Sequence, residues 1–218
     1  MALDVATMRS YDERFNAIRQ LTPNMLIPEQ EQYKGTIKDL KEKGVFRYQG
    51  KTYAVLKIGW YNETDEQFSK KKKFITYELN CLCLDTGEKV DIEWEEEDGV
   101  QVSITTQRMS FRELTDDAGE AIDEDDLDQI VDDGDSIMFR GEKFSVDDDW
   151  ASLYFREEDE EDPEKVYMYE FMNESNTKGI TIEEWDSGSG KEEYQIYESV
   201  PADPDDFVIF AKGGTGNA

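Results

Sequence analysis

The fold is decided by the stretch Arg47-Tyr48-Gln49-Gly50-Lys51-Thr52-Tyr53-Ala54-Val55. Its pattern returns 91 residues later as Met138-Phe139-Arg140-Gly141-Glu142-Lys143-Phe144-Ser145-Val146. Each copy places a glycine between two runs of alternating apolar residues. This pattern is typical of a tight β-hairpin, because glycine adopts positive φ without steric cost. The sequence therefore predicts two similar β-units.

The repeat extends over most of the chain. Three aromatic pairs recur at offsets of 90, 92 and 91 residues, namely Trp60/Trp150, Tyr77/Tyr169 and Trp94/Trp185. We therefore expect a mainly β protein made of two pseudo-repeated antiparallel β-meander units that pack together, with an N-terminal helical arm. The expected segments are a helical N-terminal extension and linker (1–35), β-unit 1 (36–112), an acidic linker with a short helical turn (113–133), β-unit 2 (134–211) and a flexible tail (212–218).

Two helices are expected outside the β-units. Residues 10–21 show apolar residues at helical intervals, and Ser10 and Glu13 have the spacing of a capping box. Leu127, Ile130 and Val131 predict a short amphipathic helix that ends at Gly134.

The first long strand is expected to end at Trp60, with a polar loop from Asn62 to Lys73 before the next strand. An acidic loop over Glu157–Asp162 is expected at the matching place in the second unit. In the tail, the glycine-rich residues from Lys212 predict a frayed end.

Composition indicates a folded chain with a very acidic surface. The 218 residues include 24 Lys and Arg against 53 Asp and Glu, which gives a net charge of −29. The 11 Tyr, 11 Phe and 4 Trp argue against disorder, since disordered segments are poor in aromatic residues. No stretch approaches the roughly 20 apolar residues that a membrane span needs, so no membrane insertion is expected. The first residues lack the pattern of a signal peptide, so we expect a cytoplasmic location.

Cysteine and histidine usage restricts the chemistry. Cys81 and Cys83 share a strand face with Tyr77 and Leu79, which predicts two small buried residues. The chain has no histidine, so two thiolates alone cannot complete a tetrahedral zinc site. Without histidine, Ser-His and Cys-His catalysis are also excluded. No cofactor is expected.

Glycine turns and strand aromatics recur in a set of stretches along the chain: Leu40-X-X-X-Gly44, Gly50–Val55, Tyr77–Leu79, Ile182–Trp185, Glu192–Tyr197 and Pro204–Ile209. Together these stretches resemble those of a bacterial family, domain of unknown function 4178, over roughly residues 36–210. The resemblance implies a β-rich bacterial cytoplasmic protein, whose genes lie near membrane-stress, tellurite-resistance-like and polyamine genes, and it transfers no catalytic residue. The chain departs from the family in its helical N-terminal extension and its acidity.

Acidic and basic clusters supply the candidate site residues. The weak metal candidates are Asp147, Asp148 and Asp149, although no window of the chain has the register of an EF-hand. A solvated acidic surface is the alternative interpretation of these charge runs. The basic cluster Lys70–Lys73 is expected to pair with acids of its own chain at the start of a strand. The candidate partner-binding residues are Glu157, Glu158, Asp159, Glu160, Glu161 and Asp162.

These features favour a non-catalytic interaction or adaptor protein that binds a basic protein surface, with a link to membrane or envelope stress implied by the family resemblance. One alternative is an acidic nucleic-acid mimic that inhibits a DNA-binding protein. We expect no competition with DNA and no direct nucleic-acid binding, because the acids crowd into loops rather than a long spaced array. A second alternative is a carboxylate-based hydrolase, which would need a cleft and a carboxyl group of raised pKa.

Overall fold

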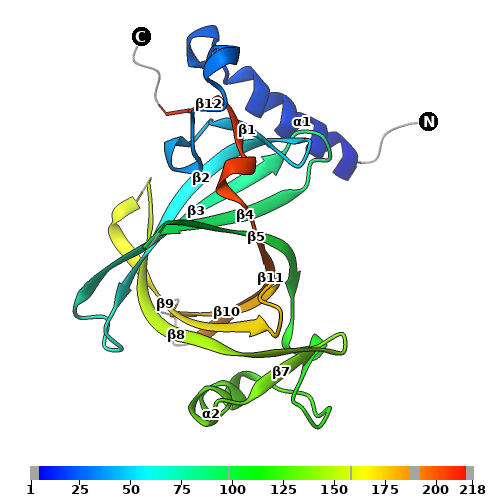
Figure 1. Ribbon diagram of the computed structural model, residues 1–218, viewed down its shortest axis with the longest axis vertical. Coiled ribbons are helices and arrows are strands. Elements are labelled where there is room, and N and C mark those ends of the chain that lie inside the picture. Colours follow the sequence, from blue (N-terminus) through cyan, green and yellow to red (C-terminus); the bar gives the residue numbers. More distant parts are fainter. Residues whose placement is uncertain (1–4, 98, 158, 187–191, 215–218) are drawn as a thin grey trace. The chain divides into compact units, whose positions relative to one another are not determined.

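The computed structural model describes residues 5–97, 99–157, 159–186 and 192–214 and has a mainly β fold, as the sequence predicts (Figure 1). Two α-helices are described, α1 (Val5–Arg19) and α2 (Leu127–Asp133). The strands of these residues are β1 (Val45–Tyr48), β2 (Lys51–Thr64), β3 (Lys71–Cys83), β4 (Lys89–Glu96), β5 (Val100–Met109), β6 (Leu114–Thr115), β7 (Ser136–Phe139), β8 (Glu142–Arg156), β9 (Asp159–Asn173), β10 (Gly179–Asp186), β11 (Glu192–Pro201) and β12 (Val208–Ala211).

The strands follow one hydrogen-bonding order, β12-β1-β2-β3-β4-β5-β11-β10-β9-β8-β7-β6, and β2 also pairs with β8. Within this order, β1 to β5 and β7 to β11 are each consecutive in the chain, so each run is an antiparallel meander. The two runs therefore have the same strand order, as the internal repeat predicts.

Both repeated glycines lie in two-residue hairpin turns. Tyr48 pairs with Lys51 across Gln49 and Gly50, and Phe139 pairs with Glu142 across Arg140 and Gly141. The two central residues of each turn have positive φ, at 46° and 79° in the first and 50° and 80° in the second. This is the signature of a type I′ turn, whose twist matches that of the flanking strands.

The aromatic pairs of the repeat do not all keep the same neighbours. Tyr77 of β3 pairs with Trp94 of β4, and their rings stack at 4.3 Å. In the second meander, Trp185 pairs with Val166, whereas Tyr169 pairs with Ile182. The partner of Tyr169 is thus three residues away from Trp185, a change of register larger than the one-residue difference between the offsets of the tyrosines and the tryptophans.

The chain forms two compact units. Unit 1 comprises residues 1–59, 77–102 and 202–218, and unit 2 comprises residues 60–76 and 103–201. In unit 1, Phe46 stacks on its cross-strand partner Tyr53 at 5.3 Å. Val45, Ala54 and Ala211 form a buried cluster, and Ala17 of α1 and Phe210 of β12 pack against it.

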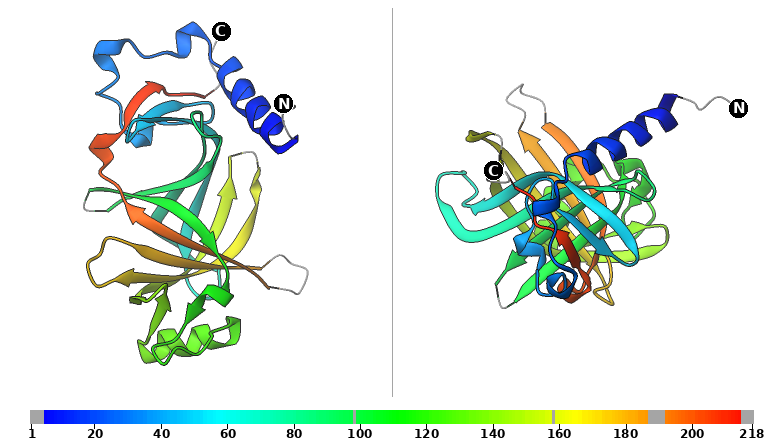
Figure 2. Two further views of the ribbon diagram at one scale, coloured as in Figure 1. Left: turned by 90° about the vertical axis from the view of Figure 1, so that its right-hand side faces the viewer. Right: turned by 90° about the horizontal axis from the view of Figure 1, so that it is seen from above.

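Unit 2 buries its main core on one face of β9, β10 and β11. Leu127 and Ile130 of α2 contribute to this core together with residues of β6, β7 and β8, which run from green to yellow-green in Figure 2. Its buried members are Leu114, Ile122, Leu127, Ile130, Ile137, Phe139, Phe144, Tyr169, Phe171, Ile180, Ile182 and Ile196.

Two strand boundaries predicted from the sequence are wrong. Strand β2 continues past Trp60 to Thr64, and β3 begins at Lys71, so the predicted loop over 62–73 is reduced to a short turn. The Asp65 carboxylate holds this turn by accepting hydrogen bonds from the backbone N–H groups of Ser69 and Lys70. Local side-chain capping of a turn is thus what permits the long strands.

The predicted helix start is wrong as well, because Ser10 lies inside α1 rather than at its N-terminus. Of the tail predicted to fray, Lys212 to Gly214 are anchored to the loop before β1. The Lys212 carbonyl accepts a hydrogen bond from Lys41, and Gly214 donates to the Glu42 carbonyl. The rest of the predicted tail lies outside the described residues.

No helix among the described residues has the length and apolar character that crossing a membrane requires.

Candidate functional site

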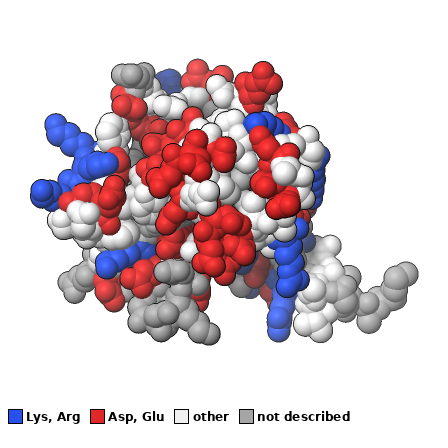
Figure 3. Space-filling view, turned by 90° about the horizontal axis from the view of Figure 1, so that it is seen from below, with Lys and Arg blue, Asp and Glu red and all other residues white. Residues whose placement is uncertain are grey.

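The segment 113–135 is a long acidic stretch without a basic residue, and we call it the acidic lobe. It contains 12 acidic residues among 23 and no lysine or arginine. All of these acids except the half-buried Asp116 are exposed. Figure 3 shows acidic side chains gathered on the face seen from below, the side on which α2 lies in Figure 1. The lobe therefore presents a concentrated negative surface.

Apolar residues hold the acidic lobe in place. Leu114, Ile122, Leu127 and Ile130 are 0–8% exposed and belong to the main core of unit 2. The acids between and after them are exposed apart from the half-buried Asp116, so the apolar side chains are buried while most of the carboxylates face solvent. Burial of such side chains contributes roughly 1.5–3 kcal/mol each, which offsets the repulsion among neighbouring acids. The acids are consequently carried on a packed scaffold.

Backbone caps fix the lobe further. The Asp123 carboxylate accepts from the N–H of Asp125, and Asp126 accepts from the N–H of Asp123, which forms a capping box before α2. Helix α2 ends at Gly134, whose φ of 67° is left-handed. Negative charge at a helix N-terminus is favourable because of the helix dipole. The caps therefore use backbone donors and leave the negative charges of the lobe unneutralised.

The lobe has little internal counter-charge. Among the described residues, Asp117 is the only acid of the lobe within ion-pair distance of a basic side chain, with Lys143 at 2.5 Å. Both partners of that pair are more than half exposed, so the pair is screened by solvent. Some of the other carboxylates of the lobe accept hydrogen bonds from neutral donors, and none of them is neutralised by a basic side chain within the described residues.

Tyr169 of β9 connects the lobe to the sheet, and the neighbouring Tyr167 bonds to a carboxylate of β8. Tyr169 donates hydrogen bonds to Asp128 of α2 and to Glu184 of β10, at 3.1 and 3.0 Å. Tyr167 donates to Asp149 of β8, and the two tyrosine rings lie 5.0 Å apart. Burial and the nearby carboxylates raise the pKa of both phenols, so both remain neutral donors.

A buried carboxylate outside the predicted site residues lies on the face of β10 opposite the main core of unit 2. Glu183 is 3% exposed; its Oε1 accepts from the hydroxyl of Tyr61 and its Oε2 from the indole N–H of Trp185, both at 2.9 Å. Trp150 and Tyr154 contact the same aromatic cluster. Both carboxylate oxygens have donors, so the local geometry is that of a structural anchor. Strand alternation places Glu183 and Trp185 on the same face of β10, and this pattern is the one sequence feature that indicates their contact.

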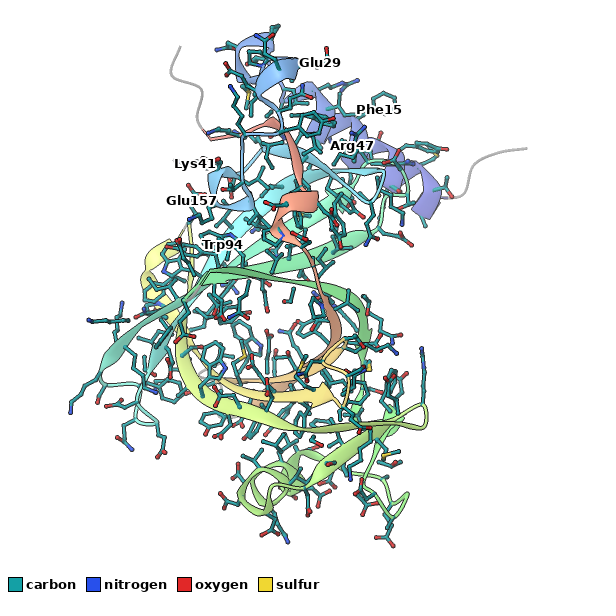
Figure 4. The ribbon with its side chains drawn as sticks, viewed as in Figure 1. Phe15, Glu29, Lys41, Arg47, Trp94 and Glu157 are labelled. Atoms are coloured by element: carbon teal, nitrogen blue, oxygen red, sulfur yellow. The ribbon has the colours of Figure 1, made fainter. Side chains whose placement is uncertain are left out.

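The predicted partner-binding run is not a loop. Strand β8 ends at Arg156 and β9 begins at Asp159, and these two residues pair across the hairpin. Glu157 and Asp162 are exposed. Glu158, and the side chains of Asp159, Glu160 and Glu161, lie outside the described part of the structure. Strand pairing overrides the acidic composition here because β8 and β9 form one long ladder. Figure 4 labels Glu157.

The three candidate metal ligands lie at consecutive positions of β8, where alternation and a β-bulge direct their side chains apart. Asp149 accepts from Tyr167, and Asp148 accepts from the backbone N–H of Asp149. Among the described residues, no group of three His, Cys, Asp or Glu side chains is arranged to hold a metal ion. The metal hypothesis gains no support from this geometry.

The lysine cluster lies mostly in the first residues of β3. Lys72 pairs with Glu63 of β2, and this hydrogen bond raises the pKa of the Lys72 ammonium. The Lys71 ammonium lies 4.2 Å from the ring centroid of Phe155. For Lys72, the expected pairing with an acid of the same chain is confirmed.

The two cysteines are free thiols and are both 1% exposed, as predicted. Burial raises the pKa of the Cys81 thiol well above its usual range. A buried protonated thiol is a poor nucleophile, so Cys81 is part of the core.

A family model described as "Domain of unknown function (DUF4178)" matches residues 43–204, which agrees with the resemblance drawn from the glycine turns and strand aromatics. No curated protein and no solved structure matches the chain.

Proposed function

We propose that this chain, which belongs to the DUF4178 family, is a non-catalytic interaction protein of the bacterial cytoplasm that binds a basic protein surface through its acidic lobe. The observation that carries the proposal is the set of exposed acids on residues 113–135, a segment without a single lysine or arginine. The carboxylates stand on a packed and capped scaffold, so little conformational entropy is lost when a partner binds.

The charge of the whole chain supports the same assignment. At a net charge of −29, the long-range field attracts cationic partners and repels nucleic acid. Electrostatic complementarity of this kind mainly raises the association rate, and the effect weakens as salt shortens the Debye length to about 8 Å at physiological ionic strength. The binding we propose is therefore fast and sensitive to salt.

The lobe is a less suitable nucleic-acid mimic. Duplex DNA presents one charge per roughly 1.7 Å along a long axis. The acids of the lobe instead surround α2, a helix of seven residues, together with the adjacent turns. A compact acidic knob of this kind fits a basic patch or peptide better than a DNA-binding groove.

Binding of a fluorescent oligolysine peptide to the full chain tests the proposal. The lobe variant E124Q/D132N/D133N removes three exposed charges that make no capping hydrogen bond to the backbone. The matched control E29Q/E31Q/E174Q removes three exposed charges elsewhere. We expect the lobe variant to weaken binding several-fold more than the control, and the difference between the two variants to shrink at high NaCl. Equal affinities for the two variants at low salt would contradict an assignment to the lobe.

Two further outcomes would favour an alternative, either a docking surface at the β8–β9 hairpin or a nucleic-acid mimic. If E157Q/D162N weakens binding more than the lobe variant does, the docking surface lies at the β8–β9 hairpin. Displacement of DNA from general DNA-binding proteins at moderate salt would favour the mimic.

A further inference from the structure

We draw no further inference here: the strongest candidate, the exposed apolar face that Met8, Tyr11, Phe15 and Ile18 form on helix α1, carries nothing, because nothing in the structure shows what covers it.

Discussion

Replacement of Tyr61 by phenylalanine tests the buried polar anchor of unit 2. The substitution removes one hydroxyl and keeps the ring, so packing against Tyr154 and Trp185 is retained. Tyr61 and Glu183 are 1% and 3% exposed, so solvent cannot replace the lost donor. A hydrogen bond to a buried charged group contributes about 1.5–3 kcal/mol, and we expect Y61F to lower the free energy of unfolding by that amount.

Urea denaturation followed by tryptophan fluorescence measures this loss, because Trp150 and Trp185 border the same cluster. The matched control is Y11F, which removes a hydroxyl from an exposed tyrosine of α1 and should change stability by less than about 0.5 kcal/mol. In a double-mutant cycle, Y61F should cost much less when Glu183 is already glutamine. A Y61F protein as stable as the wild type would refute the interpretation of Glu183 as an anchor.

Three further predictions concern charge and backbone. Raising NaCl from low to moderate concentration should raise the melting temperature, because a net charge of −29 leaves many acids unpaired. A fall in the melting temperature would show that specific ion pairs dominate. A rise with CaCl₂ but not with MgCl₂ or NaCl of equal ionic strength would instead support the metal hypothesis at Asp147–Asp149. The variant Gly134→Ala should destabilise α2 by about 1–2 kcal/mol, because φ at this position is 67° and alanine adopts this conformation at a cost. Hydrogen exchange of the acidic lobe measures this loss, and unchanged exchange would exclude a role for this cap. The pKa of Asp39 is held below its usual value, first by the hydrogen bond from the backbone N–H of Thr36 and then by Lys212. The stability that the Asp39 carboxylate contributes is therefore complete above its unfolded-state pKa and is lost as pH falls to its folded-state pKa. Below about pH 4, D39N should lose less stability than the wild type, and parallel acid titrations of the two proteins would argue against this linkage.

Local pattern was sufficient to predict the turns and the alternation of the strands. The hairpins at Gly50 and Gly141 were predicted because a two-residue turn requires positive φ, and helix α2 because apolar spacing and Gly134 define its length. The buried cysteines followed from period-two geometry. Each of these features depends on residues that are close together in the sequence.

Strand length and the anchor could not be predicted in the same way. The acidic run after Arg156 resembles a loop by composition, yet Asp159 continues a ladder that depends on residues of both β8 and β9. The structural role of Glu183 depends on its hydrogen bond with Tyr61, which is 122 residues distant in the chain. The sequence predicts an acidic linker over residues 113–133, because the core contacts of this segment, such as those of Leu114 with strands of unit 2, are also long-range and leave no local pattern.

Hydrogen–deuterium exchange of the full chain, with and without a saturating oligolysine peptide, tests most directly whether the acidic lobe is the docking surface. We predict that the peptide slows backbone exchange within residues 113–135 and that this protection disappears in E124Q/D132N/D133N but persists in E29Q/E31Q/E174Q. Protection spread evenly over all acidic segments, or concentrated at the β8–β9 hairpin with the lobe unchanged, would contradict the central claim.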